Sequence, residues 1–151
     1  MTDHETEPIA SFVAVSLDCA DPATLAEFYL RLLGGQVLWR SAKSTGIRAP
    51  GIVLVTQRIA DYRPPDWPGS SLVHLDLTAG DDLAVAVGRA VAAGAVPAEH
   101  QPDPRWRVLL DLAGHPFCIT TVLPPGLAPG NAALPRGLPG PAGRLPSYRF
   151  T

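Results

Sequence analysis

Apolar and polar residues alternate in two short stretches that start about 60 residues apart. In the first, one face of a strand would carry Val13, Val15, Leu17 and Cys19, and the other face would carry Ala14, Ser16 and Asp18. In the second, one face would carry Val73, Leu75 and Leu77, and the other face would carry His74, Asp76 and Thr78. A period of two is typical of a strand that buries one of its faces. Each stretch therefore predicts a strand with one apolar and one more polar face.

A helical pattern follows each of these strands. Asp21 and Pro22 are typical of a helix start, and Gly34 ends the first helix after an apolar stripe. In the second copy, either Asp81 or Asp82 caps a helix that runs from about residue 83 to 93. Short strand patterns follow each helix, at 36–40, around 47, and at 51–57, and again at 96–100, 106–111 and 117–122. The chain is therefore predicted to be an α+β protein with two tandem β-α-β-β-β modules, at about 12–57 and 72–123, and a site in the trough between them.

Composition narrows the classes of function. A chain of 151 residues, 46% hydrophobic, suits one domain or two half-domains that share a core. A net charge of −2 gives no basic field, so we expect no nucleic-acid partner, and no apolar run is long enough to cross a membrane. Residues 1–8 are unlike a secretory signal, so we expect the protein in the cytoplasm, with Cys19 and Cys118 as buried thiols. Residues 1–11 are expected to be a flexible N-terminus, and the Pro- and Gly-rich residues 124–151 either a disordered tail or an extended strap.

Several segments, taken in order, resemble the glyoxalase / bleomycin-resistance / dioxygenase group, or vicinal oxygen chelate superfamily, and most of all its small glyoxalase-like members. The segments are Leu17–Pro22, Ala26–Tyr29, Leu32–Gly34, Asp61–Pro68, His74–Leu77 and Asp111–Cys118, within residues 12–122. The resemblance implies two modules whose strands form a curled mixed sheet around a shared cavity that takes a small-molecule ligand or substrate. Members of the group often complete their cavities across a dimer, so a homodimer is compatible with it, as is a monomeric cavity.

Metal-dependent members of the superfamily take four ligands, one from each of four strands. The resemblance puts those positions on Ala14, Gln57, His74 and Cys118. Ala14 has no donor atom, Gln57 is a weak neutral donor, and a thiol suits a hard divalent ion poorly. His74 and Cys118 could suit zinc, which normally takes three protein ligands. We therefore expect no metal cofactor, with a divalent metal as the less favoured alternative.

The polar faces of the two predicted strands supply the candidate chemistry. The candidates for acid/base catalysis are His74, Asp76 and Asp18, because an imidazole beside carboxylates can move protons near neutral pH. The candidates for ligand binding are Ser16, Gln57, Thr78, Cys118, Trp67, Tyr62 and Trp106. The alternative for the polar residues is a satisfied network that orders the sheet, and for the aromatic residues it is ordinary packing.

Four functions remain open. The first is a metal-free, small-molecule-binding protein of secondary metabolism in bacteria, with acid/base activity of the isomerase, lyase or cyclase type on a small oxygenated metabolite. The second is a metal-dependent lyase or dioxygenase, against which Ala14 and Cys118 argue. The third is a drug-sequestering resistance protein without turnover, and the fourth is an interaction module whose cavity is closed.

Overall fold

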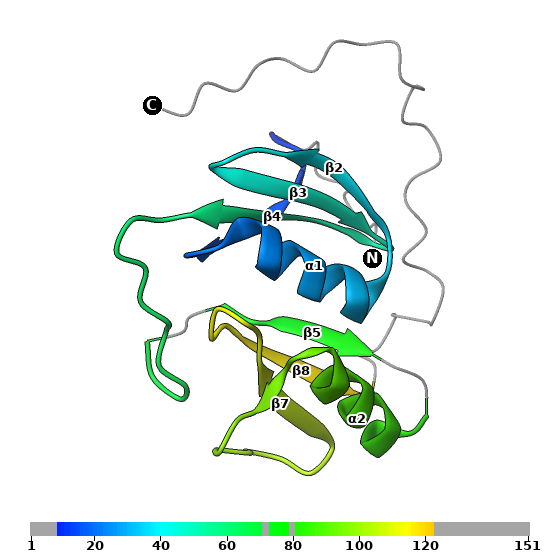
Figure 1. The fold of residues 1–151 in the computed structure, drawn as a ribbon. Helices are drawn as coiled ribbons and strands as arrows, with labels where there is room; N and C mark the ends of the chain where they lie inside the picture. The colour runs from blue at the N-terminus through cyan, green and yellow to red at the C-terminus, as the bar shows by residue number, and fades with distance from the viewer. Residues whose placement is uncertain (1–8, 71–72, 79–80, 123–151) are drawn as a thin grey trace.

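The computed structural model describes residues 9–70, 73–78 and 81–122. The first module contains β1 (Val15–Cys19), α1 (Pro22–Leu33), β2 (Gln36–Arg40), β3 (Ser44–Ala49) and β4 (Ile52–Arg58). The second contains β5 (Leu75–Thr78), α2 (Leu83–Ala93), β6 (Val96–Pro97), β7 (Trp106–Leu110) and β8 (Pro116–Thr120) (Figure 1). The predicted α+β class and the two tandem modules are confirmed. The predictions for residues 1–8 and 124–151 lie outside the described residues.

Each module forms its own mixed sheet of four strands. The strand order is β1-β4-β3-β2 in the first sheet and β5-β8-β7-β6 in the second. β1 runs parallel to β4 and β5 runs parallel to β8, while the other neighbours are antiparallel. The two sheets do not close into one curled sheet, because within the described residues β1 and β5 are both edge strands.

The helix ends follow the local signals in the sequence. The Asp21 carboxylate accepts a hydrogen bond from the backbone N–H of Thr24 at 3.2 Å, which satisfies a donor that has no partner inside the helix. Asp82, and not Asp81, caps α2, where it accepts from the backbone N–H of Val85 at 3.0 Å. Gly94 follows α2 with φ of +118°, a conformation that favours glycine.

One hydrophobic core joins the two modules. Its buried side chains are Leu25, Phe28 and Tyr29 from α1, Ile47 and Leu54 from the first sheet, Ala90 from α2, and Leu109, Phe117 and Ile119 from the second sheet. The Phe28 and Phe117 ring centroids lie 6.1 Å apart. Figure 1 shows α1 between the first sheet and β5. The apolar faces of both sheets therefore turn toward one core, and their polar faces lie on the sides away from it.

A hydrogen-bond network around the buried Asp111, the module clasp, joins the two modules. The Tyr29 hydroxyl donates to Asp111 Oδ2 at 2.6 Å, and Asp111 Oδ1 accepts from the backbone N–H groups of Ala113 and His115 at 2.8 and 3.0 Å. The His115 ring donates from Nε2 to the backbone carbonyl of Asp18 at 2.6 Å. Burial, followed by the charge of Asp111, raises the pKa of the Tyr29 phenol. The clasp joins α1 and β1 of the first module to the turn that precedes β8.

β3 and β6 differ most in length from the sequence prediction. β3 is a full strand of six residues between β2 and β4, where the sequence indicated only a short one. β6 has only two residues. Beyond Pro97, the backbone N–H of Ala98 donates to the carbonyl of Val108 at 3.0 Å, and the Gln101 side chain adds further hydrogen bonds there. Its amide donates to the carbonyl oxygens of Ala98 and Val108 at 2.9 and 2.8 Å and accepts from the N–H of Val108 at 2.9 Å.

No helix within the described residues is long and apolar enough to span a membrane. Cys19 and Cys118 are both free and buried, as predicted.

Candidate functional site

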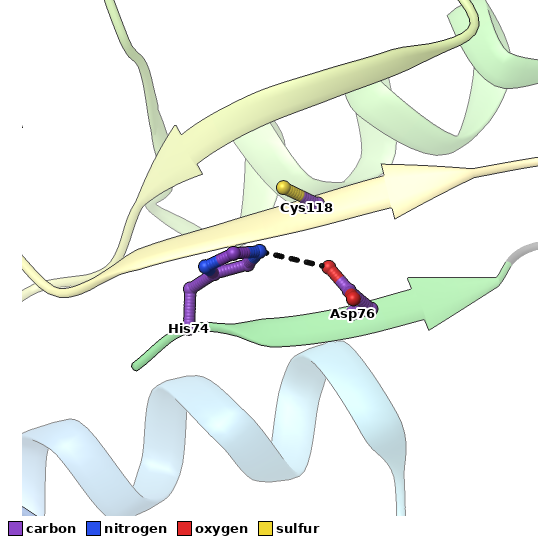
Figure 2. A group of neighbouring side chains, drawn as sticks. All are labelled: His74, Asp76 and Cys118. Carbon is purple, nitrogen blue, oxygen red and sulfur yellow. Dashed lines mark ion pairs between the residues drawn. The ribbon is translucent and has the colours of Figure 1, made fainter. Parts of the chain in front are cut away.

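Three of the predicted residues meet on the outward face of the second sheet. Asp76 in β5 lies directly opposite Cys118 in the parallel register with β8, and His74 precedes β5 by one residue with the same strand parity as Asp76. One ligand-type atom from each of the three lies within 4.8 Å of the others. Figure 2 shows the three side chains converging on one face of the two strands. We call this group the His74 cluster.

His74 and Asp76 form a partly exposed pair. Nε2 of His74 lies 3.2 Å from Oδ1 of Asp76, and the two side chains are 40% and 69% exposed. An ionised carboxylate only accepts hydrogen bonds, so this contact assigns the proton to Nε2 in the neutral imidazole. Nδ1 of His74 is then left as a lone-pair acceptor, in a side chain that is 40% exposed.

Cys118 supplies a neutral thiol to the cluster. The residue is 6% exposed. Burial, followed by the negative charge of Asp76, raises the pKa of the thiol to about 11. The thiolate is the nucleophilic form, so Cys118 is a weak nucleophile at neutral pH. Its sulfur lines the site as a small, soft surface.

An aromatic wall flanks the His74 cluster. The Trp67 ring stands edge-on to the His74 ring, with 6.1 Å between the centroids. The indole N–H of Trp67 donates to the backbone carbonyl of His100 at 3.3 Å, which fixes the ring. Trp67 and Trp106 both pack against the small cluster of Ala98, Val108 and Cys118. The two indole rings thus place apolar surface beside the polar cluster, and such surface binds planar or apolar molecules.

The structure divides the other predicted site residues between three places. Thr78 lies on β5 with the same parity as Asp76, opposite Thr120 of β8. Ser16, Asp18 and Gln57 belong to the first sheet, where Asp18 lies opposite Gln57. Tyr62 lies at the module boundary, where its hydroxyl donates to the carbonyl of Ala113 at 2.6 Å.

The sequence predicts that Ser16 and Asp18 lie close to His74 and Asp76. For a single chain, this prediction needs correction. The four residues share the predicted strand parity, but the polar faces of their sheets turn away from a common core. Two shallow hollows among the described residues have volumes of about 310 and 320 Å³. Neither is lined by a residue of the predicted site. The side chains of His74 and Asp76 are 40% and 69% exposed, so this part of the His74 cluster lies on an open face.

Val108 and Ala98 were missed as parts of this site. Successive side chains of a strand point to opposite faces, which puts Trp106, Val108 and Leu110 on one face of β7. The antiparallel register with β8 then places Val108 opposite Cys118. The run of apolar residues from Val108 to Leu110 did not show in the sequence which face each side chain takes, and the register with β8 was not visible either.

The donor set does not fit the four-ligand site of a hard divalent ion. Ala14 offers no donor, and Gln57 belongs to the other sheet from His74 and Cys118. The His74 cluster does offer an imidazole, a carboxylate and a thiol, which are the ligand types that zinc takes. Zinc would have to displace the thiol proton of Cys118, which the raised pKa retains at neutral pH.

Comparison with known proteins identifies the family. The family model described as a glyoxalase-like domain matches residues 14–120. The chain belongs to this family. A search of curated proteins found no match to the sequence.

Solved structures share the fold of this glyoxalase-like domain. A glyoxalase/bleomycin resistance protein/dioxygenase family enzyme from Burkholderia phytofirmans PsJN is 20% identical, with a TM-score of 0.61 over 76% of this chain and 100% of that one. A mutant of the fosfomycin resistance protein FosX from Listeria monocytogenes, complexed with Mn(II) and 1S,2S-dihydroxypropylphosphonic acid, is 14% identical, with a TM-score of 0.60 over 76% and 91% of the two chains. A glyoxalase-related enzyme from Fulvimarina pelagi is 20% identical, with a TM-score of 0.56 over 74% and 88%.

Proposed function

We propose that this glyoxalase-like protein binds a small oxygenated metabolite and catalyses proton transfer on it, without a hard divalent metal. The reaction would be of the isomerase, lyase or cyclase type. The observation that carries the proposal is the His74–Asp76 pair, held at 3.2 Å on an open face beside two indoles. The absence of a donor at Ala14 supports the metal-free form of the chemistry.

The pair supplies a base and its orienting group. Nδ1 of neutral His74 takes a proton from a carbon next to a carbonyl group, or from a hydroxyl group, of the bound metabolite. The ring then carries a positive charge, which the Asp76 carboxylate stabilises at Nε2. The same nitrogen returns the proton to a neighbouring atom, or the substrate expels a leaving group. A positioned base of this kind contributes on the order of 10²- to 10⁴-fold in rate.

The residues around the pair would bind the substrate. Trp67 and Trp106 offer apolar surface to the carbon skeleton, and Trp67 also restrains the ring of His74. Thr78 carries the nearest hydroxyl group with the same parity on β5. Cys118, neutral and buried, fills the space behind the pair without competing for the proton.

A homodimer would cover the open face, and two features of the fold support one. β1 and β5 are edge strands whose outer backbone groups pair with no strand among the described residues. Phe12 and Val13, just before β1, are 78% and 75% exposed. Exposed apolar residues beside a free edge are typical of an association surface. Sedimentation equilibrium would test this assembly, and a monomer at all concentrations would contradict it.

The test of the reaction is proton exchange at carbon. The wild-type protein is incubated in D₂O with a panel of α-hydroxy ketones, and deuterium incorporation next to the carbonyl is followed by NMR. We expect catalysed exchange that is lost in His74→Ala and strongly reduced in Asp76→Asn. His100→Ala is the matched control, because His100 is exposed and contacts Trp67 through its backbone carbonyl alone. Equal exchange in His74→Ala and wild type would refute the proposal.

Sequestration without turnover is a second candidate, and the indole wall of Trp67 and Trp106 favours it. It predicts that a ligand binds with no proton exchange. It also predicts that Trp106→Ala weakens binding, while His74→Ala leaves binding unchanged. The exchange experiment therefore separates the two functions.

A further inference from the structure

The outward face of the first sheet carries an aromatic ring and a cation to which the proposed function gives no role. The ring belongs to Trp39 in β2 and the cation to Arg48 in β3. β2 and β3 are neighbours, and Trp39 lies opposite Gly46 in their register. Neither residue belongs to the His74 cluster, which lies on the second sheet.

The Trp39 ring is held over a position that only glycine can occupy. A Cβ atom at Gly46 would lie 2.2 to 2.4 Å from three carbons of the indole. The indole N–H of Trp39 also donates to the Ser44 hydroxyl at 3.1 Å. The ring is thus fixed across β3 by a contact beneath it and a hydrogen bond at its edge, yet Trp39 remains 40% exposed. A large apolar ring that is both restrained and exposed is a preformed binding surface.

Arg48 lies two residues beyond Gly46 on β3, so its side chain leaves the sheet on the same face, about 7 Å further along the strand. Its Nε atom is buried, and among the described residues it has no hydrogen-bond partner. No carboxylate group of the described residues lies within 4.0 Å of its guanidinium group. Arg48 also lines the hollow of about 310 Å³, together with Gly35, Gln36, Ala49 and Pro50.

A buried donor without an acceptor is rare in folded proteins and calls for a ligand or a solvent molecule. An arginine beside a hollow meets this need best with an oxyanion, because the guanidinium group donates along its whole edge. The anion cannot come from a carboxylate group of the described residues, since none lies within reach. The structure thus offers a cation with an unused donor two residues along β3 from Gly46, the residue over which the exposed Trp39 ring lies.

We propose that Trp39 and Arg48 form a binding site for a planar small molecule that carries an oxyanion. The flat part of the ligand stacks on the indole of Trp39, and its carboxylate or phosphate group accepts hydrogen bonds from Arg48, Nε included. The site lies outside the His74 cluster, so it does not depend on the proton-transfer chemistry proposed there.

The test compares four probes in binding to the full chain by isothermal titration calorimetry. Benzoate and phenyl phosphate carry both ring and anion, benzamide lacks the charge, and acetate lacks the ring. We expect benzoate or phenyl phosphate to bind at least about tenfold more tightly than benzamide and acetate. The tighter of the two identifies the anionic group. The indole N–H resonance of Trp39, assigned with Trp39→Phe, should shift on binding.

Variants test the two halves of the site separately. Arg48→Gln should weaken the anionic probe about tenfold or more and leave benzamide unaffected, since one charged donor is lost. Arg48→Lys keeps the charge but lacks the Nε donor, so it should also bind the anionic probes more weakly. This variant replaces Arg48→Gln in the test if Arg48→Gln does not fold. Arg89→Gln is the matched control, because Arg89 is an exposed cation on α2.

Three results would each overturn the proposal. The first is unchanged affinity for the anionic probes in both Arg48 variants. The second is benzamide binding as tightly as benzoate and phenyl phosphate. The third is no binding of either anionic probe up to its solubility limit. Because His74→Ala should leave these affinities unchanged, the failure of the site on the first sheet is distinguishable from failure of the proton-transfer proposal.

Discussion

The module clasp predicts how much one buried hydroxyl group contributes to the stability of the whole domain. Replacing Tyr29 by Phe removes the 2.6 Å hydrogen bond to Asp111 and changes little else, because the rings have nearly the same shape. Both residues are buried, at 1% and 4% exposure. The substitution leaves Asp111 Oδ2 without its donor in a site that solvent barely reaches.

The expected loss of stability in Tyr29→Phe follows from the burial and the charge of this hydrogen bond. A hydrogen bond to a charged group contributes about 1.5 to 3 kcal/mol, and the acceptor left unpaired keeps its desolvation penalty. We therefore expect Tyr29→Phe to lower the free energy of unfolding by about 2 to 3 kcal/mol. For a domain of this size, that corresponds to a fall in Tm of roughly 5 to 10 °C.

Urea denaturation followed by circular dichroism measures the effect, and a lower midpoint with an unchanged slope would show that stability alone has changed. Tyr62→Phe is the matched control, because it loses a hydroxyl that donates at 2.6 Å to a neutral carbonyl and is only partly buried. It should cost about 0.5 to 1.5 kcal/mol. The reasoning is refuted if Tyr29→Phe costs no more than Tyr62→Phe, because burial and charge would then add nothing.

Three further predictions concern alkali, a helix cap and metal content. Burial is the largest cause that raises the pKa values of Cys19 and Cys118 to about 11 from 9.0, so folding favours the protonated thiols. Their stabilising contribution should be complete below pH 9 and lost as the pH rises toward 11, which urea midpoints measured between these values would show; a flat profile would contradict it. Asp82→Ala removes the cap of α2 and should cost about 1 kcal/mol in the same assay, whereas Asp81→Ala, its exposed neighbour, should cost little. The protein purified without chelator should hold far less than one equivalent of zinc by elemental analysis, and a stoichiometric content that falls in Cys118→Ser would assign the His74 cluster to zinc instead.

The helices and most strands could be predicted because their signals are local. Asp21, Pro22 and Gly34 act within one helical turn, and the alternation in β1 and β5 acts between neighbouring residues. The full length of β3 could not be read in the same way, since Gly46 weakens a strand pattern. Its neighbours β2 and β4 make it a strand by supplying hydrogen-bond partners on both sides.

Only the local part of the candidate site could be predicted from the sequence. Strand parity placed His74 and Asp76 on one face, and the structure shows them in contact. Cys118 joins them through the parallel register of β5 and β8, which is a contact between distant segments. The sequence predicted Asp76 only as a catalytic group. The four ligand positions implied by the family resemblance do not include it, so it was not compared as a metal ligand.

The sequence by itself determined which face of β1 and of β5 is polar, where both helices lie to within a residue or two, and that the chain contains two copies of one unit. These features depend on backbone geometry and on side chains a few residues apart. Only the tertiary structure decided how the two polar faces are oriented, because the apolar faces of both sheets pack into a single core with α1 and α2. That packing puts Asp18 and His74 on different sheets that face away from the core. It leaves the His74–Asp76 pair partly exposed on one sheet, and on the other the exposed Trp39 ring with the partly buried Arg48.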